Sequence, residues 1–344
     1  MRCCHPLIIS IENLNMGEKV TICIPVYNME SSVAAAIESA INQTYDNIEI
    51  LVLDNCSTDN TFSIATRYTP RGVRVEKNPT NLGAYGNHNR CIELASGSWI
   101  KFLHGDDDLL PNCVERIMSA IDNCRQGISL AACGAICLDG EDREVRRTYT
   151  PERNIVLDRS NFLELLLVGN IVGTPTMTII RRDDIARFGK FDIEMEPASD
   201  GEMWFRFMNE GRTLFLAEHL VAIRDDPPES IAKRSRLQAN FLNQIFRHVE
   251  KIEGSHIELG QRQRDILDHY LLNESVRFFD LGIIYTLRAG NLTLLMSLAN
   301  HLRGRGILAR ALRYYFATRI LGSGLNRERK QPWPQRLEQM ILCQ

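Results

Sequence analysis

The stretch VTICIPVYN at residues 20–28 decides the fold, because it is an apolar run that ends abruptly in polar residues. Its β-branched residues are typical of a buried strand. Similar runs follow at residues 48–54, 73–77 and 99–104, and segments with apolar residues at helical spacing separate the first three runs. This alternation predicts an α/β fold with a mainly parallel central sheet, whose ligands bind at the carboxyl ends of the strands.

The alternating pattern continues to a break near residue 230. We predict helices from Pro111, at residues 161–168 and at residues 200–209, and strands at residues 128–138, 177–180, 214–216 and 220–224. The sequence DDPP at residues 225–228 is the clearest break in the chain, and strand patterns disappear beyond it. We therefore predict one domain at residues 19–230 and a helical C-terminal region at residues 231–344.

Bulk composition is that of a soluble globular protein. The chain has 344 residues, of which 44% are hydrophobic and 24% are charged, which is enough material for a large core. A formal net charge of −3 gives no overall attraction to nucleic acid, so we expect no nucleic-acid partner. The cysteines lack paired metal-ligand spacing, and we find neither a signal peptide nor a charge-free segment that could span a membrane. These features predict a cytoplasmic protein.

An aspartate ends the second predicted strand. Asp54 would point into the crevice at the sheet edge, where its carboxylate can accept hydrogen bonds from a nucleotide base or ribose. The alternative is that Asp54 and Ser57 only cap the following helix, for which Ser57 is a suitable N-cap residue.

A denser acidic cluster follows the fourth predicted strand, in the sequence HGDDD at residues 104–108. Three consecutive carboxylates repel one another unless a cation binds there, and oxygen ligands with an imidazole suit Mg²⁺ or Mn²⁺ bridging a diphosphate. In an extended segment His104 and Asp106 would point to the same face. The imidazole could then coordinate Mn²⁺ or donate to a phosphate oxygen. The alternatives are a solvated acidic turn and a His104 that packs against the strand.

Asp200 begins a further predicted helix, whose Met203, Trp204 and Phe207 would face the core. A carboxylate fixed at that position could take a proton from an acceptor hydroxyl, although capping of the helix is the simpler alternative. The chain lacks a Gly-x-Ser-x-Gly elbow, a phosphate loop and a Gly-x-Gly-x-x-Gly motif after the first strand. Their absence argues against dinucleotide oxidoreductases and P-loop kinases.

A series of short motifs runs in a fixed order through residues 19–230. They are residues 20–28, Ser39-x3-Gln43-Thr44-Tyr45, Glu49-x4-Asp54-x2-Ser57-Thr58-Asp59, Asn81-Leu82-Gly83, His88-Asn89, Ala95-Ser96-Gly97, Asp106-Asp107 with Pro111, Ile180-Arg181-Arg182, Phe188-Gly189-Lys190-Phe191-Asp192 and Ser199-Asp200-x3-Trp204. The series closely resembles the family 2 glycosyltransferases, and the combination is far more specific than any single motif.

The resemblance implies a nucleotide-diphospho-sugar transferase (GT-A) fold and an inverting enzyme. Such an enzyme moves a sugar from a nucleotide-sugar donor, with a UDP-sugar favoured, to an acceptor hydroxyl in surface polysaccharide or glycan assembly. It further implies that Asp106 binds Mn²⁺ or Mg²⁺, with His104 at a neighbouring ligand position, and that Asp200 is the general base. The residues implied to bind the donor nucleotide are Pro25, Tyr27, Asn28, Asp54, Asn89 and Asp107.

Three positions depart from the family pattern. His104 stands where the family usually has the first acid of Asp-x-Asp, Ser199 replaces the usual Glu, and Asp226 falls where many relatives have the His of Arg-x-His. An alternative is therefore a non-catalytic nucleotide-sugar binder with a degraded metal site, although the retained acids argue against it. A sugar-nucleotide pyrophosphorylase would need a Gly-rich basic loop after the first strand, which VYNM at residues 26–29 does not supply.

Arginines accumulate in the predicted helical region after His301. They could meet anionic headgroups or the diphosphate of a lipid-linked acceptor, which would bring this cytoplasmic protein to the inner face of the membrane as a peripheral contact. Ordinary packing on the first domain is the alternative, because apolar residues such as Ile307, Leu312 and Phe316 leave no clean polar face.

Overall fold

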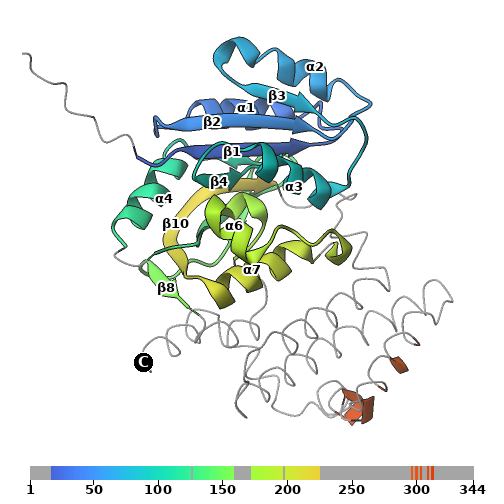
Figure 1. Ribbon diagram of the computed structural model, residues 1–344, viewed down its shortest axis with the longest axis vertical. Helices are drawn as coiled ribbons and strands as arrows, with labels where there is room; N and C mark the ends of the chain where they lie inside the picture. Colours follow the sequence, from blue (N-terminus) through green and yellow to red (C-terminus); the bar gives the residue numbers. More distant parts are fainter. Residues whose placement is uncertain are drawn as a thin grey trace, which may run out of the picture.

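The computed structural model describes residues 17–124, 127–158, 172–196 and 198–224, with a few isolated residues between 296 and 313. Within these ranges a ten-stranded sheet is flanked by helices (Figure 1). The helix predicted at residues 161–168 lies outside the described residues, as does the helical region predicted at residues 231–344 apart from those isolated positions.

The first half of the sheet is parallel, as predicted. Its strands are β1 (Val20–Val26), β2 (Ile48–Asp54), β3 (Arg74–Lys77) and β4 (Trp99–Phe102), in the order β3-β2-β1-β4. The connecting helices are α1 (Val33–Ile41), α2 (Thr61–Thr66), the 3₁₀ helix η1 (Thr69–Arg71) and α3 (Ala84–Leu94). Because these strands are parallel, their carboxyl ends meet at one edge, which brings Asn28, Asp54 and His104 to the same side of the sheet.

The second half of the sheet is mixed. Its elements are β5 (Asp108–Leu109), α4 (Cys113–Asp122), β6 (Leu130–Leu138), β7 (Glu144–Arg147), β8 (Ile155–Leu157), η2 (Pro175–Met177), β9 (Thr178–Arg181), α6 (Arg182–Phe188), η3 (Ile193–Met195), α7 (Ser199–Glu210) and β10 (Thr213–Arg224). Strand β9 runs antiparallel to both β4 and β6, and β10 runs parallel to β6. The parallel half is thus joined to the remaining strands through β9.

Alternation along β1 explains how the sheet is covered. Val20, Ile22 and Ile24 are fully buried in the same cluster as residues of α1 and α4. Cys23 points the other way, and its thiol contacts the carbonyl oxygen of Cys91 in α3 at 3.8 Å. Figure 1 shows α3, α6 and α7 together in front of the sheet. The period of two along the strand therefore gives both faces of the sheet a helical layer.

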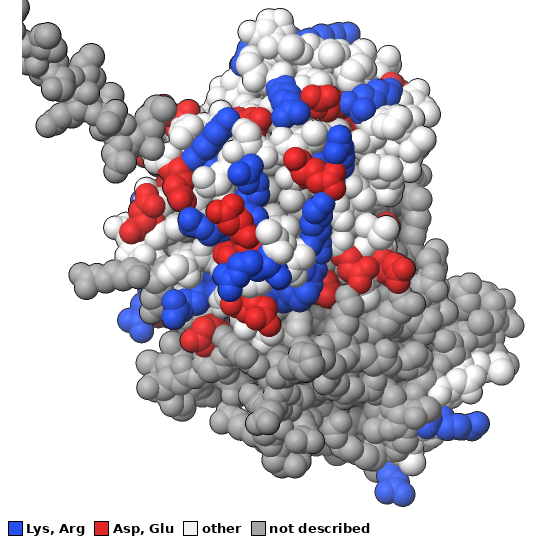
Figure 2. Space-filling model, viewed as in Figure 1, with Lys and Arg blue, Asp and Glu red and all other residues white. Residues whose placement is uncertain are grey.

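Basic and acidic side chains are interspersed over this front face, as Figure 2 shows in the same view. Lys190, which follows α6, pairs with Glu93 of α3 at 2.6 Å, and Arg90 pairs with Glu93 at 2.8 Å. The first pair connects α3 to the segment after α6, and the second lies within α3. Among the helices in the described ranges, none combines the length and the apolar character that crossing a bilayer requires.

Two predicted features differ from the structure by more than a shift of a few residues. The runs at residues 214–216 and 220–224 belong to one strand, β10, whose pairing with β6 shifts register around His219. The helix after β2 begins at Thr61 with Asn60 as its N-cap, so the prediction that Ser57 caps it is wrong. Instead, the hydroxyl of Ser57 accepts a hydrogen bond from the backbone N–H of Asn28 at 2.9 Å.

Candidate active site

The acidic sequence after β4 folds as a tight turn. The backbone N–H of Asp107 donates to the carbonyl oxygen of His104 at 3.1 Å, so the expectation of an extended segment is wrong. The turn nevertheless brings one ligand atom each of His104, Asp106 and Asp107 within 4.8 Å of one another. The three side chains that the sequence singled out thus converge by a different backbone path.

Gly105 allows this turn to pack against the end of β1. A Cβ atom at Gly105 would lie 2.6 Å from the sulfur of Met29 and 2.7 Å from Cγ1 of Val26. Both distances are far inside van der Waals contact, so any side chain here would push the turn away from β1. The turn is therefore held where the strand ends meet.

Burial and crowding make the turn suitable for a cation. The pKa of the Asp106 carboxyl is raised by burial and then by the charge of Asp107. Both causes disfavour a second negative charge at this place, and a divalent cation would remove that penalty. The oxygen ligands of Asp106 and Asp107, with the imidazole of His104, form a donor set that fits Mn²⁺ or Mg²⁺.

Asp107 has protein partners on both carboxylate oxygens. Oδ2 accepts a hydrogen bond from the hydroxyl of Thr176 at 2.6 Å, and Oδ1 accepts one from the backbone N–H of Arg224 at 3.2 Å. The side chain is buried. These contacts make Asp107 an anchor of the turn, and the nucleotide contact predicted for it stays a prediction.

Arg224, at the end of β10, contacts the same turn through its guanidinium group. It donates to the carbonyl oxygen of Asp106 at 2.6 Å, pairs with Asp108 at 3.1 Å and donates to Asp142 at 2.9 Å. The sequence pointed to Asp226, two residues further along, and not to Arg224 itself. Its only sequence signal was its place in the altered Arg-x-His motif.

A chain of hydrogen bonds fixes the orientation of His104. His88 is buried, and burial first, then the charge of His104, lowers its pKa to about 3. Neutral His88 places its Nδ1 2.8 Å from the carbonyl oxygen of Ala84, so Nδ1 must carry the proton and Nε2 must accept. Nε2 of His104, 3.4 Å away, is then the donor.

This orientation leaves Nδ1 of His104 as the atom that could meet a metal. Nδ1 lies 3.5 Å from Oδ2 of Asp107. Burial lowers the pKa of His104, but the hydrogen bond to Asp107 and the charges of Asp107, Asp106 and Asp200 outweigh it and raise the pKa overall. A metal ion would have to displace the proton from Nδ1. The metal contact predicted for His104 therefore stays a prediction with a defined atom.

The buried neutral His88 should make the protein sensitive to acid. Its pKa of about 3 in the folded chain lies below the ordinary value of 6.5. Between these two pH values His88 is therefore protonated in the unfolded chain and neutral in the folded chain. This difference should lower the free energy of unfolding by about 2 kcal/mol at pH 5. Urea unfolding at pH 7 and pH 5 should therefore show a larger loss for wild type than for His88→Gln. Equal losses would contradict the assignment.

Asp200 lies at the start of α7, close to the acidic turn. The N-cap residue of α7 is Ala198, which removes the interpretation that Ser199 or Asp200 is the cap. Burial raises the pKa of Asp200 to about 6, against the lowering effects of the Gly201 backbone N–H and the charge of His104. The charge of Asp200 in turn contributes to the raised pKa of His104, so the two groups are within electrostatic reach of each other. A carboxylate with this pKa suits proton abstraction near neutral pH.

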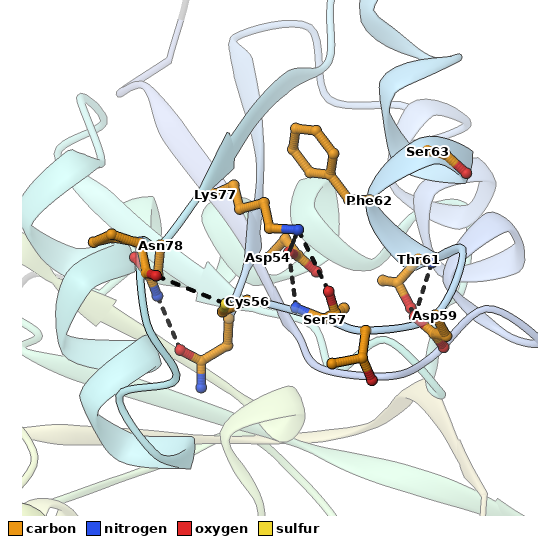
Figure 3. Close-up of polar contacts among 12 residues, drawn as sticks. Asp54, Cys56, Ser57, Asp59, Thr61, Phe62, Ser63, Lys77 and Asn78 are labelled. Atoms are coloured by element: carbon orange, nitrogen blue, oxygen red, sulfur yellow. Dashed lines mark hydrogen bonds and ion pairs between the residues drawn. The ribbon is translucent and has the colours of Figure 1, made fainter.

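One carboxylate oxygen of Asp54 has protein partners in the described part of the chain and the other does not. It is fully buried, and Oδ2 accepts from the backbone N–H of Ser57 at 3.0 Å and lies 3.5 Å from the ammonium of Lys77 (Figure 3). Oδ1 has no hydrogen-bond partner among the described residues. A buried acceptor without a donor is costly, so a donor group that reached this oxygen would be bound favourably.

Three other residues predicted to bind the nucleotide, Pro25, Tyr27 and Asn28, lie in or just after β1. Asn28 has a positive φ of 53°, and its side-chain oxygen accepts from the backbone N–H of Thr58 at 2.9 Å, which joins the ends of β1 and β2. Tyr27 beside it is 42% exposed. Pro25 lies within β1, opposite Leu53 of β2.

Asn89 connects α3 to the segment that precedes η3. Its amide donates to the carbonyl oxygen of Phe191 at 2.8 Å and accepts from the N–H of the same residue at 3.0 Å. The structure thus gives Asn89 a backbone partner on each side of its amide, and its predicted nucleotide contact stays a prediction.

Comparison with known proteins assigns the residues around this site to a family. Residues 21–189 match the sequence profile described as Glycosyl transferase family 2. These residues belong to glycosyltransferase family 2. Asp200 lies beyond the matched segment, so its role depends on its position next to the acidic turn.

Relatives of the family 2 domain match over different lengths. An uncharacterized protein of Mycobacterium tuberculosis is 29% identical over 60% of this chain and 66% of its own length. An uncharacterized glycosyltransferase of Rickettsia typhi is 28% identical over 78% of this chain and 84% of its own length. The Escherichia coli UDP-Glc:alpha-D-GlcNAc-diphosphoundecaprenol beta-1,3-glucosyltransferase WfaP is 40% identical, but over only 26% of this chain and 36% of WfaP.

Solved structures confirm the GT-A fold of the family 2 domain. Staphylococcus aureus TarS 1-349 in complex with UDP-GlcNAc matches with a TM-score of 0.64 and 19% identity, over 85% of this chain and 81% of TarS 1-349. The mannosyltransferase PcManGT from Pyrobaculum calidifontis, in complex with GDP-Man and Mn²⁺, matches with a TM-score of 0.53 and 14% identity, over 89% of this chain and 88% of that protein.

Proposed function

We propose that this protein is an inverting glycosyltransferase that moves a sugar from a nucleotide-sugar donor, with a UDP-sugar favoured, to an acceptor hydroxyl. The observation that carries the proposal is the placement of Asp200, with its pKa raised to about 6, next to the turn that gathers His104, Asp106 and Asp107. Direct displacement at a sugar carbon requires a base for the acceptor hydroxyl and, beside it, a cation that binds the leaving diphosphate.

The donor side of the reaction uses groups at the ends of β2 and β4. Asp106, with Nδ1 of His104 and Asp107, would hold Mn²⁺ or Mg²⁺, which when bound neutralises charge on the departing diphosphate. The unsatisfied oxygen of Asp54 would accept a hydrogen bond from the nucleotide. The UDP-GlcNAc complex of TarS and the UDP-Glc in the name of WfaP support a UDP-sugar as donor.

On the acceptor side, Asp200 removes the proton from the attacking hydroxyl. The new bond forms from the acceptor oxygen to the anomeric carbon as the bond from that carbon to the diphosphate oxygen breaks. Attack from the face opposite the leaving group inverts the configuration. The proton resides on the Asp200 carboxyl until water removes it.

We further propose a glycan or lipid-linked acceptor in polysaccharide assembly, at the cytoplasmic face of a membrane. The support is the diphosphoundecaprenol-linked acceptor in the name of WfaP. The two-part organisation at residues 19–230 and 231–344 and the peripheral contact through the C-terminal helices are part of this proposal. Most of that second region lies outside the described residues.

A turnover screen tests the proposed function. The protein is incubated with Mn²⁺, a panel of UDP- and GDP-sugars and an undecaprenyl-diphosphate-sugar analogue, and release of nucleoside diphosphate is measured. We expect acceptor-dependent release from a UDP-sugar and a product whose new linkage, by NMR, has the opposite anomeric configuration to the donor. A product that retains the donor configuration would refute direct displacement by Asp200.

A further inference from the structure

A threonine that belongs to none of the sequence motifs described above holds the acidic turn in place. Thr176 is fully buried in η2. Its hydroxyl donates to Oδ2 of Asp107 at 2.6 Å and accepts from the backbone N–H of His104 at 3.1 Å. One hydroxyl therefore connects the first and the last residue of the turn.

The position of η2 is itself fixed from two sides. Lys101 of β4 is fully buried, and its ammonium donates to the carbonyl oxygen of Thr176 and, at 3.3 Å, to that of Thr178. Trp204 of α7 donates through its indole N–H to the carbonyl oxygen of Gly173 at 3.0 Å. Burying an ammonium group is costly unless it is hydrogen-bonded, so these carbonyl contacts constrain where η2 can lie.

The chemistry of the contact requires a hydroxyl. Threonine offers one donor and two acceptor sites, and here it satisfies a buried carboxylate and a backbone N–H with a single atom. A side chain of the same shape without the hydroxyl would leave both groups short of a partner. Asp107 would then keep its contact with the Arg224 backbone, and the turn would lose its attachment to η2.

We propose that Thr176 is a positioning residue for the metal-binding turn. It fixes the Asp107 carboxylate and the backbone of His104, so that the ligand atoms of His104, Asp106 and Asp107 face one point before the cation arrives. Preorganisation of this kind is what outer-shell partners supply to metal ligands. The inference rests on the proposed function, because it takes the turn to be the cation site.

Binding of Mn²⁺ alone, measured by EPR of the free ion, tests this role without any turnover. Thr176→Val should lower Mn²⁺ affinity by about 10–100-fold, as the loss of other outer-shell partners does. Thr176→Ser keeps the hydroxyl and should bind Mn²⁺ close to wild type. Thr176→Ala, which adds no bulk, should reproduce the loss and serves as the test if the valine variant does not fold.

Thr178 provides a matched control in the next residue but one. It is also fully buried, and its hydroxyl donates to the carbonyl oxygen of Pro175 at 2.9 Å, away from the turn. Thr178→Val should lower the Tm and leave Mn²⁺ affinity unchanged. Wild-type Mn²⁺ affinity in Thr176→Val, or an equal loss of Mn²⁺ affinity in Thr178→Val, would overturn the role of Thr176 and leave the proposed metal dependence standing. A wild-type protein that binds no Mn²⁺ would overturn both this inference and the proposed metal dependence.

Discussion

Replacement of Asp200 by asparagine is expected to lower kcat for sugar transfer by about 10²–10⁴-fold, because a positioned general base supplies that factor. Donor affinity should stay close to wild type, since the proposed donor contacts lie at the ends of β2 and β4. The measurement is kcat together with calorimetric donor affinity. Asp183→Asn, which removes an exposed carboxylate from α6, is the matched control and should change neither value.

The pH dependence of wild type gives the same prediction a second readout. Burial raises the pKa of Asp200 to about 6, and only the ionised carboxylate can accept a proton. We therefore expect kcat to rise through about pH 6 and to level off above it. Near-normal kcat in Asp200→Asn would assign the base to another residue. Glu202 is a poor substitute, because its buried carboxylate is bound by Arg206 at 2.8 Å.

Replacement of Asp106 by asparagine should remove the metal-dependent part of donor binding. The change keeps the size of the side chain and removes the charge that would face the cation. We expect Mn²⁺ affinity to fall on the order of 100-fold or more, since loss of an outer-shell partner alone costs 10–100-fold. EPR of free Mn²⁺ and the kcat at saturating Mn²⁺ measure the effect.

Two variants of neighbouring residues make the Asp106 experiment specific. Asp108→Asn removes an adjacent carboxylate that pairs with Arg224 at 3.1 Å and lies outside the group of three converging ligands. It should keep most of the Mn²⁺ affinity. His104→Gln should give a smaller loss than Asp106→Asn, because both imidazole nitrogens already face protein partners. Equal losses in Asp106→Asn and Asp108→Asn would argue against a defined cation site in the turn.

The sequence was sufficient to predict the parallel half of the sheet and the polar residues at its edge. Strands β1, β2 and β4 are mostly apolar, Asp54 ends β2 and the acidic turn follows β4 closely, so local pattern carried the information. The acidic turn shows the limit of that approach. The period of two predicted an extended path, and the absence of a side chain at Gly105 permits a tight turn against β1 instead.

Residues that act across the fold could not be found this way. Thr176 and Arg224 both hold Asp107, from 69 and 117 residues further along the chain. Strand β10 was divided in the prediction because polar residues interrupt its apolar pattern near His219. The strand continues there in its pairing with β6, and the imidazole of His219 lies 2.8 Å from the carbonyl oxygen of Thr148. Each of these features depends on a tertiary partner that local sequence does not reveal.

Calorimetric titration of wild-type protein with UDP, in Mn²⁺ and then in EDTA, tests whether a cation held by the turn at residues 104–107 binds the diphosphate of the donor. UDP carries that diphosphate and is common to every UDP-sugar, so the result does not depend on knowing the sugar. We expect clear binding in Mn²⁺ and at least about tenfold weaker binding in EDTA. Equal UDP affinity in the two buffers would contradict it.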